Sequence, residues 1–220
     1  MKTLVILAGG KSSRMGEDKT FIKYKGKTFL ETLLDNAQGL FGRVIISGGS
    51  KEHSEEIYNY LKANNKTCSV LTPEIYADNY DSIGPMGGVL SVFEQAKPDK
   101  FALVSVDMPM ADLKVLSLLY NSVENSEDEV THASLTKPAV VLADSEGKAI
   151  PSAGIYTKAG YDILKESMEK GQYSLFKALG ENMGLLSPAR LVRIQPSLGK
   201  VDFDAAFKNY NTKEDLKTLR

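Results

Sequence analysis

The first half of the chain alternates short β-branched apolar runs with longer segments whose apolar residues recur at helical spacing. Short apolar runs predict buried strands, and a 3.6-residue period predicts the helices that cover them. We expect strands at residues 3–8, 44–47, 68–72 and 101–106, and helices at residues 29–40, 54–64, 87–95 and 114–122. Such alternation is typical of parallel strands joined by crossover helices.

The second half departs from this pattern after a polar, acidic stretch at residues 125–131, which predicts a surface loop. Apolar runs at 138–143 and 153–156 flank the turn Asp144-Ser145-Glu146-Gly147 and predict an antiparallel hairpin. We also expect helices at residues 160–170, 174–179 and 212–219, the last capped by Thr212, and a late strand at residues 191–195. Together the elements predict a single-domain α/β fold: a three-layer α/β/α arrangement with a mostly parallel, Rossmann-like central sheet and a small antiparallel excursion.

Composition narrows the class of protein. Apolar residues make up 42% of the chain and charged residues 25%, as in ordinary globular proteins, and the formal charge of -1 gives no general attraction to nucleic acid or to an anionic membrane. No apolar run approaches the roughly 20 residues of a membrane span, so we expect a cytoplasmic protein. Cys68 is the sole cysteine, which excludes an intramolecular disulfide, and His53 and His132 are expected to be surface residues rather than metal ligands.

The strongest chemical signal is the loop from Leu7 to Lys19, Leu-Ala-Gly-Gly-Lys-Ser-Ser-Arg-Met-Gly-Glu-Asp-Lys, which directly follows the first expected strand. Open α/β sheets bind ligands at this edge, and glycines such as Gly9 and Gly10 let backbone N–H groups approach a phosphate. Arg14 and Lys19 add positive charge, so the loop predicts a polyphosphate site with both cations in catalytic roles. Its spacing matches neither a Walker loop nor a Rossmann fingerprint.

Two further signals lie at the same predicted edge. Asp107 ends the apolar run at 101–106, and since Mg²⁺ takes one or two carboxylates together with substrate phosphates, Asp107 is the candidate ligand of a Mg²⁺ cofactor. The small-residue turn at 84–88 opens an expected helix and allows a nucleotide to approach closely. Asp78, upstream of this turn, is a candidate for contact with a ribose or base, although loop aspartates are most often simply solvated.

The loop at residues 7–19 resembles the signature of the molybdenum cofactor guanylyltransferase (MobA) family of the nucleotidyltransferase superfamily. Gly84-Pro85-Met86-Gly87-Gly88 resembles the family's Gly-Pro-Leu-Ala-Gly turn, and Val106-Asp107-Met108-Pro109 its Cys-Asp-Thr-Pro element. Residues 209–216 are similar to its Asn-x-Asn-Thr-Pro-Glu-Asp-Leu ending. These motifs occur in the family's order, so the resemblance covers nearly the whole chain.

The resemblance implies transfer of GMP from GTP to the phosphate of molybdopterin, with release of diphosphate. It divides the single domain, residues 1–220, into a nucleotide-binding half at about 1–124 and an acceptor-binding half at about 132–220. The expected nucleotide site comprises Leu7, Ala8, Gly9, Gly10, Lys19, Ser47, Asp78, Gly84, Pro85 and Asp107, and the expected acceptor site comprises Pro151, Tyr156, Asn209 and Asn211. Ser47 stands where many members have an asparagine, so the choice of base depends on Ser47 and Asp78.

Three alternatives stay open. They are CTP-dependent transfer to molybdopterin, transfer to a sugar or polyol phosphate, and a non-catalytic nucleotide-binding regulator. A regulator that had lost its chemistry is expected to lack Lys19 or Asp107, and both are present. The expected partners are GTP and molybdopterin as small-molecule substrates, without nucleic acid or membrane, and other molybdenum cofactor biosynthesis proteins in transient contact.

Overall fold

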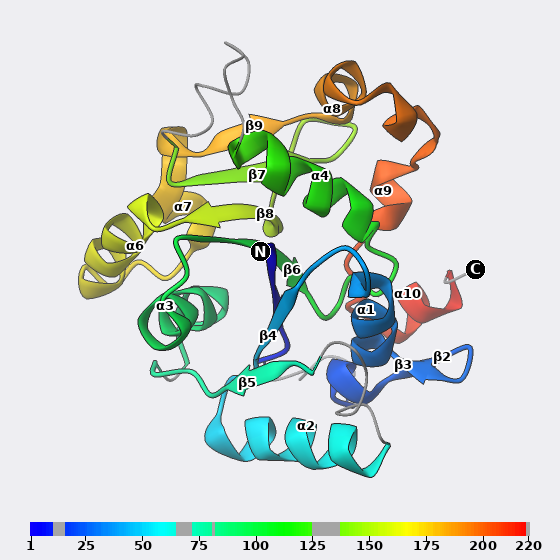
Figure 1. Ribbon diagram of the computed structural model, residues 1–220. Coiled ribbons are helices and arrows are strands. Elements are labelled where there is room, and N and C mark those ends of the chain that lie inside the picture. The colour runs from blue at the N-terminus through cyan, green and yellow to red at the C-terminus, as the bar shows by residue number, and fades with distance from the viewer. Residues whose placement is uncertain (11–15, 65–71, 81, 125–136, 219–220) are drawn as a thin grey trace.

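A seven-stranded sheet with the strand order β5-β4-β1-β6-β8-β7-β9 forms the centre of the molecule. The structure is a computed structural model that describes residues 1–10, 16–64, 72–80, 82–124 and 137–218 (Figure 1). The strands are β1 (Thr3–Leu7), β4 (Arg43–Ser47), β5 (Glu74–Tyr76), β6 (Lys100–Ser105), β7 (Ala139–Ala143), β8 (Ala149–Thr157) and β9 (Gly184–Leu186). A separate small hairpin pairs β2 (Lys23–Tyr24) with β3 (Lys27–Thr28).

Among the described strands of this large sheet, β8 alone runs against the others. β1 pairs in parallel with β4 and β6, and β4 pairs in parallel with β5. β8 is antiparallel to both β6 and β7, and β9 returns parallel to β7. The expected mostly parallel sheet with a small antiparallel excursion is therefore confirmed.

Helices cover both faces of the sheet, because successive residues of each strand point to opposite faces (Figure 1). Leu4 and Ile6 of β1 belong to the core on one face, and Val5 and Leu7 belong to the core on the other. The first face is covered by α1 (Phe29–Ala37), α2 (Lys51–Ala63) and α4 (Leu113–Glu124), and the second by α3 (Pro85–Ala96), α6 (Ala159–Glu169) and α7 (Leu175–Leu179). The expected three-layer α/β/α arrangement is confirmed.

The segment after β9 packs back onto the first face. It contains α8 (Pro188–Ile194), α9 (Phe203–Ala206) and α10 (Lys213–Lys217), and the short 3-10 turns of the chain are η1 (Lys19–Phe21), η3 (Gly180–Asn182) and η4 (Pro196–Lys200). Phe203, Phe207 and Tyr210 are buried in the first-face core, so residues 209–211 are held against the sheet. None of the helices described here combines the length and apolar character required to cross a bilayer.

Local sequence signals set where the helices begin. Thr28 caps α1 in a reciprocal capping box with Glu31, and Ser50 caps α2 by accepting from the backbone N–H of His53. Gly84 and Pro85 open α3, with Gly84 at a positive φ of 65° that suits glycine and Pro85 in the first turn. α10 begins at the expected cap, Thr212.

Most of the expected elements are present, but the end of the sheet differs. Residues 191–195 were predicted as a strand, and this prediction is wrong: they fall mainly in α8, which Ser187 caps and Pro188 opens. The late strand is instead β9. Residues 68–71 of the strand expected at 68–72, which include Cys68, lie outside the described residues, and so does the loop expected at 125–131. The third parallel strand in chain order is β5.

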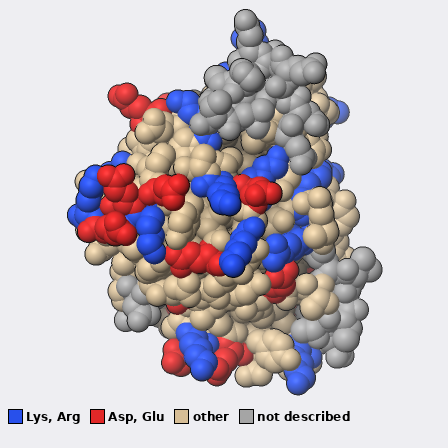
Figure 2. All heavy atoms as spheres, turned by 60° about the vertical axis from the view of Figure 1, so that its left-hand side comes forward, with Lys and Arg blue, Asp and Glu red and all other residues tan. Residues whose placement is uncertain are grey.

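A polar cluster on the surface ties α3 to α6. The Glu94 carboxylate on α3 accepts hydrogen bonds from Tyr80 at 2.5 Å, from Tyr161 at 2.8 Å and from Lys165 at 3.0 Å. Burial raises the pKa of this carboxyl, but the four donors of Tyr80, Asn79, Lys165 and Tyr161 outweigh burial and lower the pKa to about 2. Figure 2 shows the face that carries α3 and α6, where acidic and basic side chains lie interspersed.

We predict that Glu94→Gln lowers the free energy of unfolding by about 2 kcal/mol at pH 7, because four donors lose a charged acceptor. The folded-state pKa is below the ordinary 4.5, so the carboxylate stabilises the fold fully above pH 4.5 and loses its effect as the pH falls through about 2. Urea unfolding of both proteins at pH 7 and pH 3 measures this. The difference should be smaller at pH 3, and Glu166→Gln, which removes an exposed pair with Lys170, should leave the midpoint unchanged at both values.

Candidate functional site

The carboxyl ends of the parallel strands bring the expected site residues to one edge. Leu7 at the end of β1 lies in register with Ser47 of β4 and with Ser105 of β6. The chain leaves β1 through Gly9 and Gly10, and it leaves β6 through Asp107. The nucleotide loop and the candidate metal ligand are therefore neighbours, as the sequence predicts.

Two loops touch through glycine backbones at this edge. A Cβ placed on Gly9 would lie 2.6 Å from the Cα of Gly49 and 2.7 Å from its backbone nitrogen. The backbone N–H groups of Ala8 and Gly9 both donate to the carbonyl of Ser47, at 2.9 and 3.0 Å. The N–H groups of Ala8 and Gly9 are therefore occupied by this contact with Ser47, so a nucleotide bound at this turn would have to contact other backbone groups of the loop.

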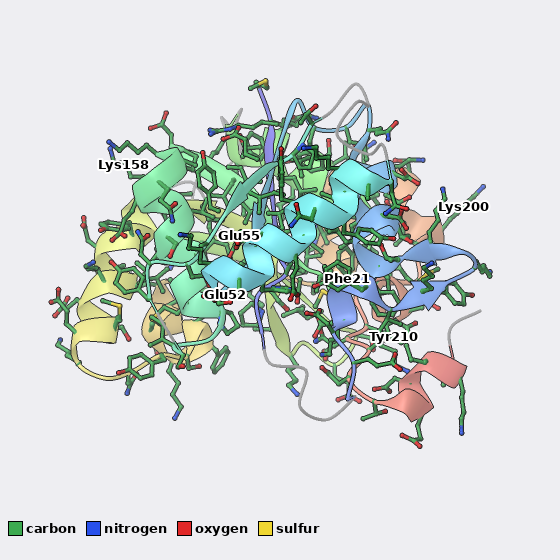
Figure 3. The ribbon with its side chains drawn as sticks, turned by 90° about the horizontal axis from the view of Figure 1, so that it is seen from below. Phe21, Glu52, Glu55, Lys158, Lys200 and Tyr210 are labelled. Atoms are coloured by element: carbon green, nitrogen blue, oxygen red, sulfur yellow. The ribbon has the colours of Figure 1, made fainter. Side chains whose placement is uncertain are left out.

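The chemical centre joins residues that lie far apart in the sequence. The Lys19 ammonium donates to Oδ2 of Asp107 at 3.0 Å and to Oδ1 of Asn211 at 2.5 Å. The side chains of Lys19 and Asp107 are each 17% exposed, so the pair is partly shielded but open to a ligand. The backbone N–H of Tyr210 also donates to the carbonyl of Asp107 at 2.9 Å. The site is thus completed by the segment that precedes α10, and Figure 3 shows Tyr210 close to that helix.

Asp107 has the chemistry that a bound Mg²⁺ requires. Its Oδ1 is buried and has no hydrogen-bond partner among the described residues, while Oδ2 faces Lys19. A carboxylate oxygen without a donor is costly to bury, and a hard cation is the partner that it suits. The described residues hold no group of three or more metal-binding side chains. Mg²⁺ commonly takes one or two carboxylates together with substrate phosphates.

Lys19 is held in place by the residue before it. Asp18 caps η1 by accepting from the backbone N–H of Thr20 at 2.8 Å, and its other oxygen lies 2.7 Å from Nε2 of His53. His53 was expected to be a surface residue, and that expectation is wrong, since its side chain is only 15% exposed. Its pairing with Asp18 has no signal in the sequence, because the two residues belong to different elements. His132 lies outside the described residues.

The pKa values of this pair move in opposite directions. Burial raises the pKa of the Asp18 carboxyl, but hydrogen bonds from His53 and from Thr20 outweigh burial and lower it overall. The hydrogen bond to Asp18 raises the pKa of His53, against the opposing effect of burial. The charged pair is therefore the favoured state.

Ser47 and Asp78 form a pair beneath the start of α3. The Ser47 hydroxyl donates to Oδ1 of Asp78 at 2.7 Å, and Ser47 is buried, so this serine acts through Asp78 rather than by reaching outward. Gly88 allows the close approach of α3, since a Cβ there would lie 2.4 Å from Oγ of Ser47. Gly84 and Pro85 are exposed at the same helix end.

A cavity of about 440 Å³ is lined in part by Asn209, the residue before Tyr210, whose backbone N–H donates to the carbonyl of Asp107. Pro151 and Asn209, two of the four expected acceptor residues, both line it. Asn211 lies apart from this lining and contacts Lys19 instead. Lys148 and Lys208 give the cavity wall positive charge, while Asp144, Glu146 and Asp204 give it negative charge.

The expectation that Tyr156 contacts an acceptor needs correction. Tyr156 is fully buried, it stacks on Phe101, and its hydroxyl donates to the carbonyl of Pro151 at 2.7 Å. Burial raises the pKa of this phenol, which stays protonated as a donor. Pro151 lies where the β7–β8 pairing shifts register, between partners Val141–Gly154 and Leu142–Ile150, and its missing N–H suits such a bulge. Tyr156 therefore fixes the cavity wall from behind.

The remaining predicted residue, Arg14, lies outside the described residues, so its catalytic role stays a prediction. The described residues bring Lys19, Asp107 and Asn211 together directly. Asn209 and Pro151 lie in the neighbouring cavity. The sequence had predicted this neighbourhood but not the individual contacts.

The sequence also matches known proteins of one family. A family profile described as "MobA-like NTP transferase domain" matches residues 4–183. The chain is 27% identical over 219 residues to the "Probable molybdenum cofactor guanylyltransferase" of Aquifex aeolicus (strain VF5), which covers 100% of this chain and 90% of that protein. A protein of the same name from Clostridium perfringens (strain SM101 / Type A) is 27% identical over 177 residues, 80% of this chain and 76% of that one.

A solved structure supports the fold. The crystal structure of molybdopterin-guanine dinucleotide biosynthesis protein A from Archaeoglobus fulgidus is similar, with a TM-score of 0.75 at 19% identity. The match covers 98% of this chain and 95% of that one. The three-layer arrangement around the mixed sheet is thus shared across that distance in sequence.

We predict that Gly9→Ala destabilises the protein by about 1–3 kcal/mol, because the new methyl would meet backbone atoms of Gly49 that cannot turn aside. Thermal or urea unfolding measures the change. Gly199→Ala is the matched control, since a Cβ there meets only Val192 at an ordinary 3.6 Å. Equal stability of the two variants would contradict the proposed contact between the loops.

Proposed function

The chain belongs to the MobA-like NTP transferase domain family, and from that premise we propose that it transfers GMP from GTP to the phosphate of molybdopterin, forming molybdopterin guanine dinucleotide and diphosphate. The observation that carries the proposal is the meeting of Lys19, Asp107 and Asn211 at the carboxyl edge of the sheet. The names of the two relatives support guanylyl transfer. The Archaeoglobus structure's name supports the same dinucleotide product.

The reaction requires alignment and charge more than proton transfer. An oxygen of the acceptor phosphate attacks the α-phosphorus of GTP, and the bond from that phosphorus to the diphosphate breaks. The nucleophile is already anionic, so no general base is needed. Lys19 stabilises the negative charge that builds up on the departing diphosphate, Arg14 of the same loop shares this role, and Asn211 orients Lys19.

The proposed cofactor is Mg²⁺, held by Asp107 through its unpaired Oδ1. When bound, the cation supplies Lewis-acid stabilisation of phosphoryl oxygens. Lys19 lies at the other oxygen of the same carboxylate, so it aligns Asp107 without occupying Oδ1. The carboxylate would then contact both Lys19 and the cation.

The acceptor is proposed to bind in the 440 Å³ cavity. Its volume lies within the usual range for small-molecule pockets, about 300–1,000 Å³. Pro151 and Asn209 line the cavity, and Asn209 lies two residues before Asn211, which contacts Lys19. An acceptor in the cavity would therefore have its phosphate close to the charged centre.

The choice of guanine is proposed to depend on Asp78. Ser47 fixes this carboxylate by a hydrogen bond, and an ionised carboxylate only accepts hydrogen bonds. The guanine edge carries N1–H and N2–H₂ donors side by side, whereas the cytosine edge has a single N4–H₂ donor beside acceptors. A fixed carboxylate at the base therefore favours GTP over CTP.

We predict that Lys19→Ala and Asp107→Ala each lower turnover by about 100-fold or more, as expected when a group that stabilises transition-state charge is removed. Diphosphate release with Mg·GTP and molybdopterin measures turnover. Lys23→Ala, a change at an exposed lysine of β2, is the matched control and should keep wild-type activity. Near-normal turnover in either site variant, with an unchanged melting temperature, would contradict the mechanism.

We also predict that GTP with Mg²⁺ raises the melting temperature more than CTP, ATP or UTP does, since a ligand that binds the folded state stabilises it. Asp78→Ala should reduce the preference for GTP over CTP by about tenfold or more, because the donors of guanine lose their acceptor. Asp99→Ala, at an exposed position, is the control. Stabilisation by CTP alone would replace guanine with cytosine in the proposed reaction.

A further inference from the structure

His53 connects the nucleotide loop to α2 and to the end of β4. Its Nδ1 lies 2.6 Å from the carbonyl oxygen of Gly48, and its Nε2 lies 2.7 Å from Oδ2 of Asp18. The side chain is 15% exposed, and the ring of Phe21 packs against it edge-on at a centroid distance of 6.0 Å. Figure 3 shows Phe21 beside α2, and Glu52 and Glu55 of that helix are exposed.

Both partners of the ring are pure acceptors. A carbonyl oxygen and an ionised carboxylate have no proton to donate, so the Nδ1 contact requires an N–H there, while the Nε2 contact is a close ion pair rather than an aligned hydrogen bond. Neutral histidine carries one N–H, and only the imidazolium carries two. The cation is the state that suits both contacts, at 2.6 and 2.7 Å, because a negative carboxylate at 2.7 Å from Nε2 attracts a positively charged ring.

The charged groups around the ring agree with that state. Asp18 faces it from the loop, and Glu56 adds negative potential from the next turn of α2. The positive end of α2 opposes a cation at this position, as does burial of the ring. The hydrogen bond to Asp18 is the largest influence, and the pKa of His53 rises above its ordinary 6.5.

The contacts lead from His53 to the catalytic lysine. One oxygen of Asp18 caps η1 at Thr20, and the other meets His53, so the carboxylate is held from both sides. η1 begins at Lys19, whose ammonium reaches Asp107 and Asn211. Any release of Asp18 frees the start of η1, and with it the backbone that aims Lys19.

On the basis of the proposed nucleotidyl transfer, we propose that the His53 imidazolium is a positioning residue for Lys19, acting through Asp18 and the start of η1. In its charged form it locks the loop to α2 and to Gly48, which keeps Lys19 opposite Asp107. When the ring loses its proton, one ring nitrogen presents a lone pair to an acceptor oxygen, and that contact becomes repulsive. The start of η1 is then no longer held against α2, so the enzyme loses the alignment of Lys19 but no group that takes part in the reaction.

The first test reads the proton itself. Long-range ¹H–¹⁵N NMR distinguishes a doubly protonated ring from either neutral tautomer, and His132→Gln assigns the signals because the chain has 2 histidines. We expect His53 to be doubly protonated at pH 7 and to titrate above 6.5, and we expect Asp18→Asn to lower that midpoint. A neutral His53 at pH 7, or a midpoint that Asp18→Asn leaves unchanged, overturns the proposal.

The second test reads nucleotidyl transfer. His53→Gln should lower kcat/KM for GTP about tenfold at pH 6.5, in line with the loss of one charge-assisted hydrogen bond, and should remove the alkaline limb that wild type shows as His53 deprotonates. His53→Gln and Asp18→Asn together should cost less than the sum of the single changes, and His132→Gln should match wild type.

A wild-type KM and an unchanged pH profile in His53→Gln overturn the positioning role. A wild-type protein that transfers no nucleotide overturns the proposed function and the role in transfer with it. In that case the NMR titration still decides whether His53 holds Asp18 as a cation. The two failures are therefore distinguishable.

Discussion

The contact between the Lys19 ammonium and the Asp107 carboxylate is the constraint that organises the edge of the sheet. A carboxylate that is only 17% exposed needs a positive partner, because an unpaired charge at this depth costs several kcal/mol. The partner comes from the loop after β1, 88 positions earlier, and the amide that orients it comes from Asn211, 192 positions after Lys19. Three segments must fold correctly before the charge is satisfied, so the geometry of the site is tied to the completion of the fold.

That contact depends in turn on how closely the loops can approach. The Gly9–Gly49 contact lets the turns after β1 and β4 meet backbone to backbone, and Gly88 lets α3 approach Ser47. His53 then fastens the distal part of the first loop to α2. Glycines allow these loops and helices to approach closely, and the charged pairs then fix how the elements are oriented. Gly9 thus has a packing reason besides any contact with phosphate.

Sequence patterns predicted the features that are local. β1, β4 and β6 are continuous apolar runs, and the hairpin of β7 and β8 surrounds a clear turn, so period and turn chemistry were sufficient. The pattern failed at α8, where β-branched residues suggested a strand but Ser187 and Pro188 start a helix, and it missed β5, which has three half-buried residues and no apolar run. His53 pairs with Asp18, and Tyr156 packs against Phe101. Both partners are distant in sequence, so neither composition nor local pattern could predict these contacts.

The reversal of β8 has a consequence for how such a protein can diverge. Because β8 runs antiparallel to β6, with Val104 opposite Ala153, the start of β8 rather than its end lies near the edge where β1 and β6 finish. The turn at 144–148, which contributes to the cavity wall, can therefore gain or lose residues without moving β1 and β6, the parallel strands that precede Lys19 and Asp107. If the cavity binds the acceptor as proposed, acceptor preference and nucleotide transfer depend on separate parts of one sheet. Evolution could then change the first without altering the second.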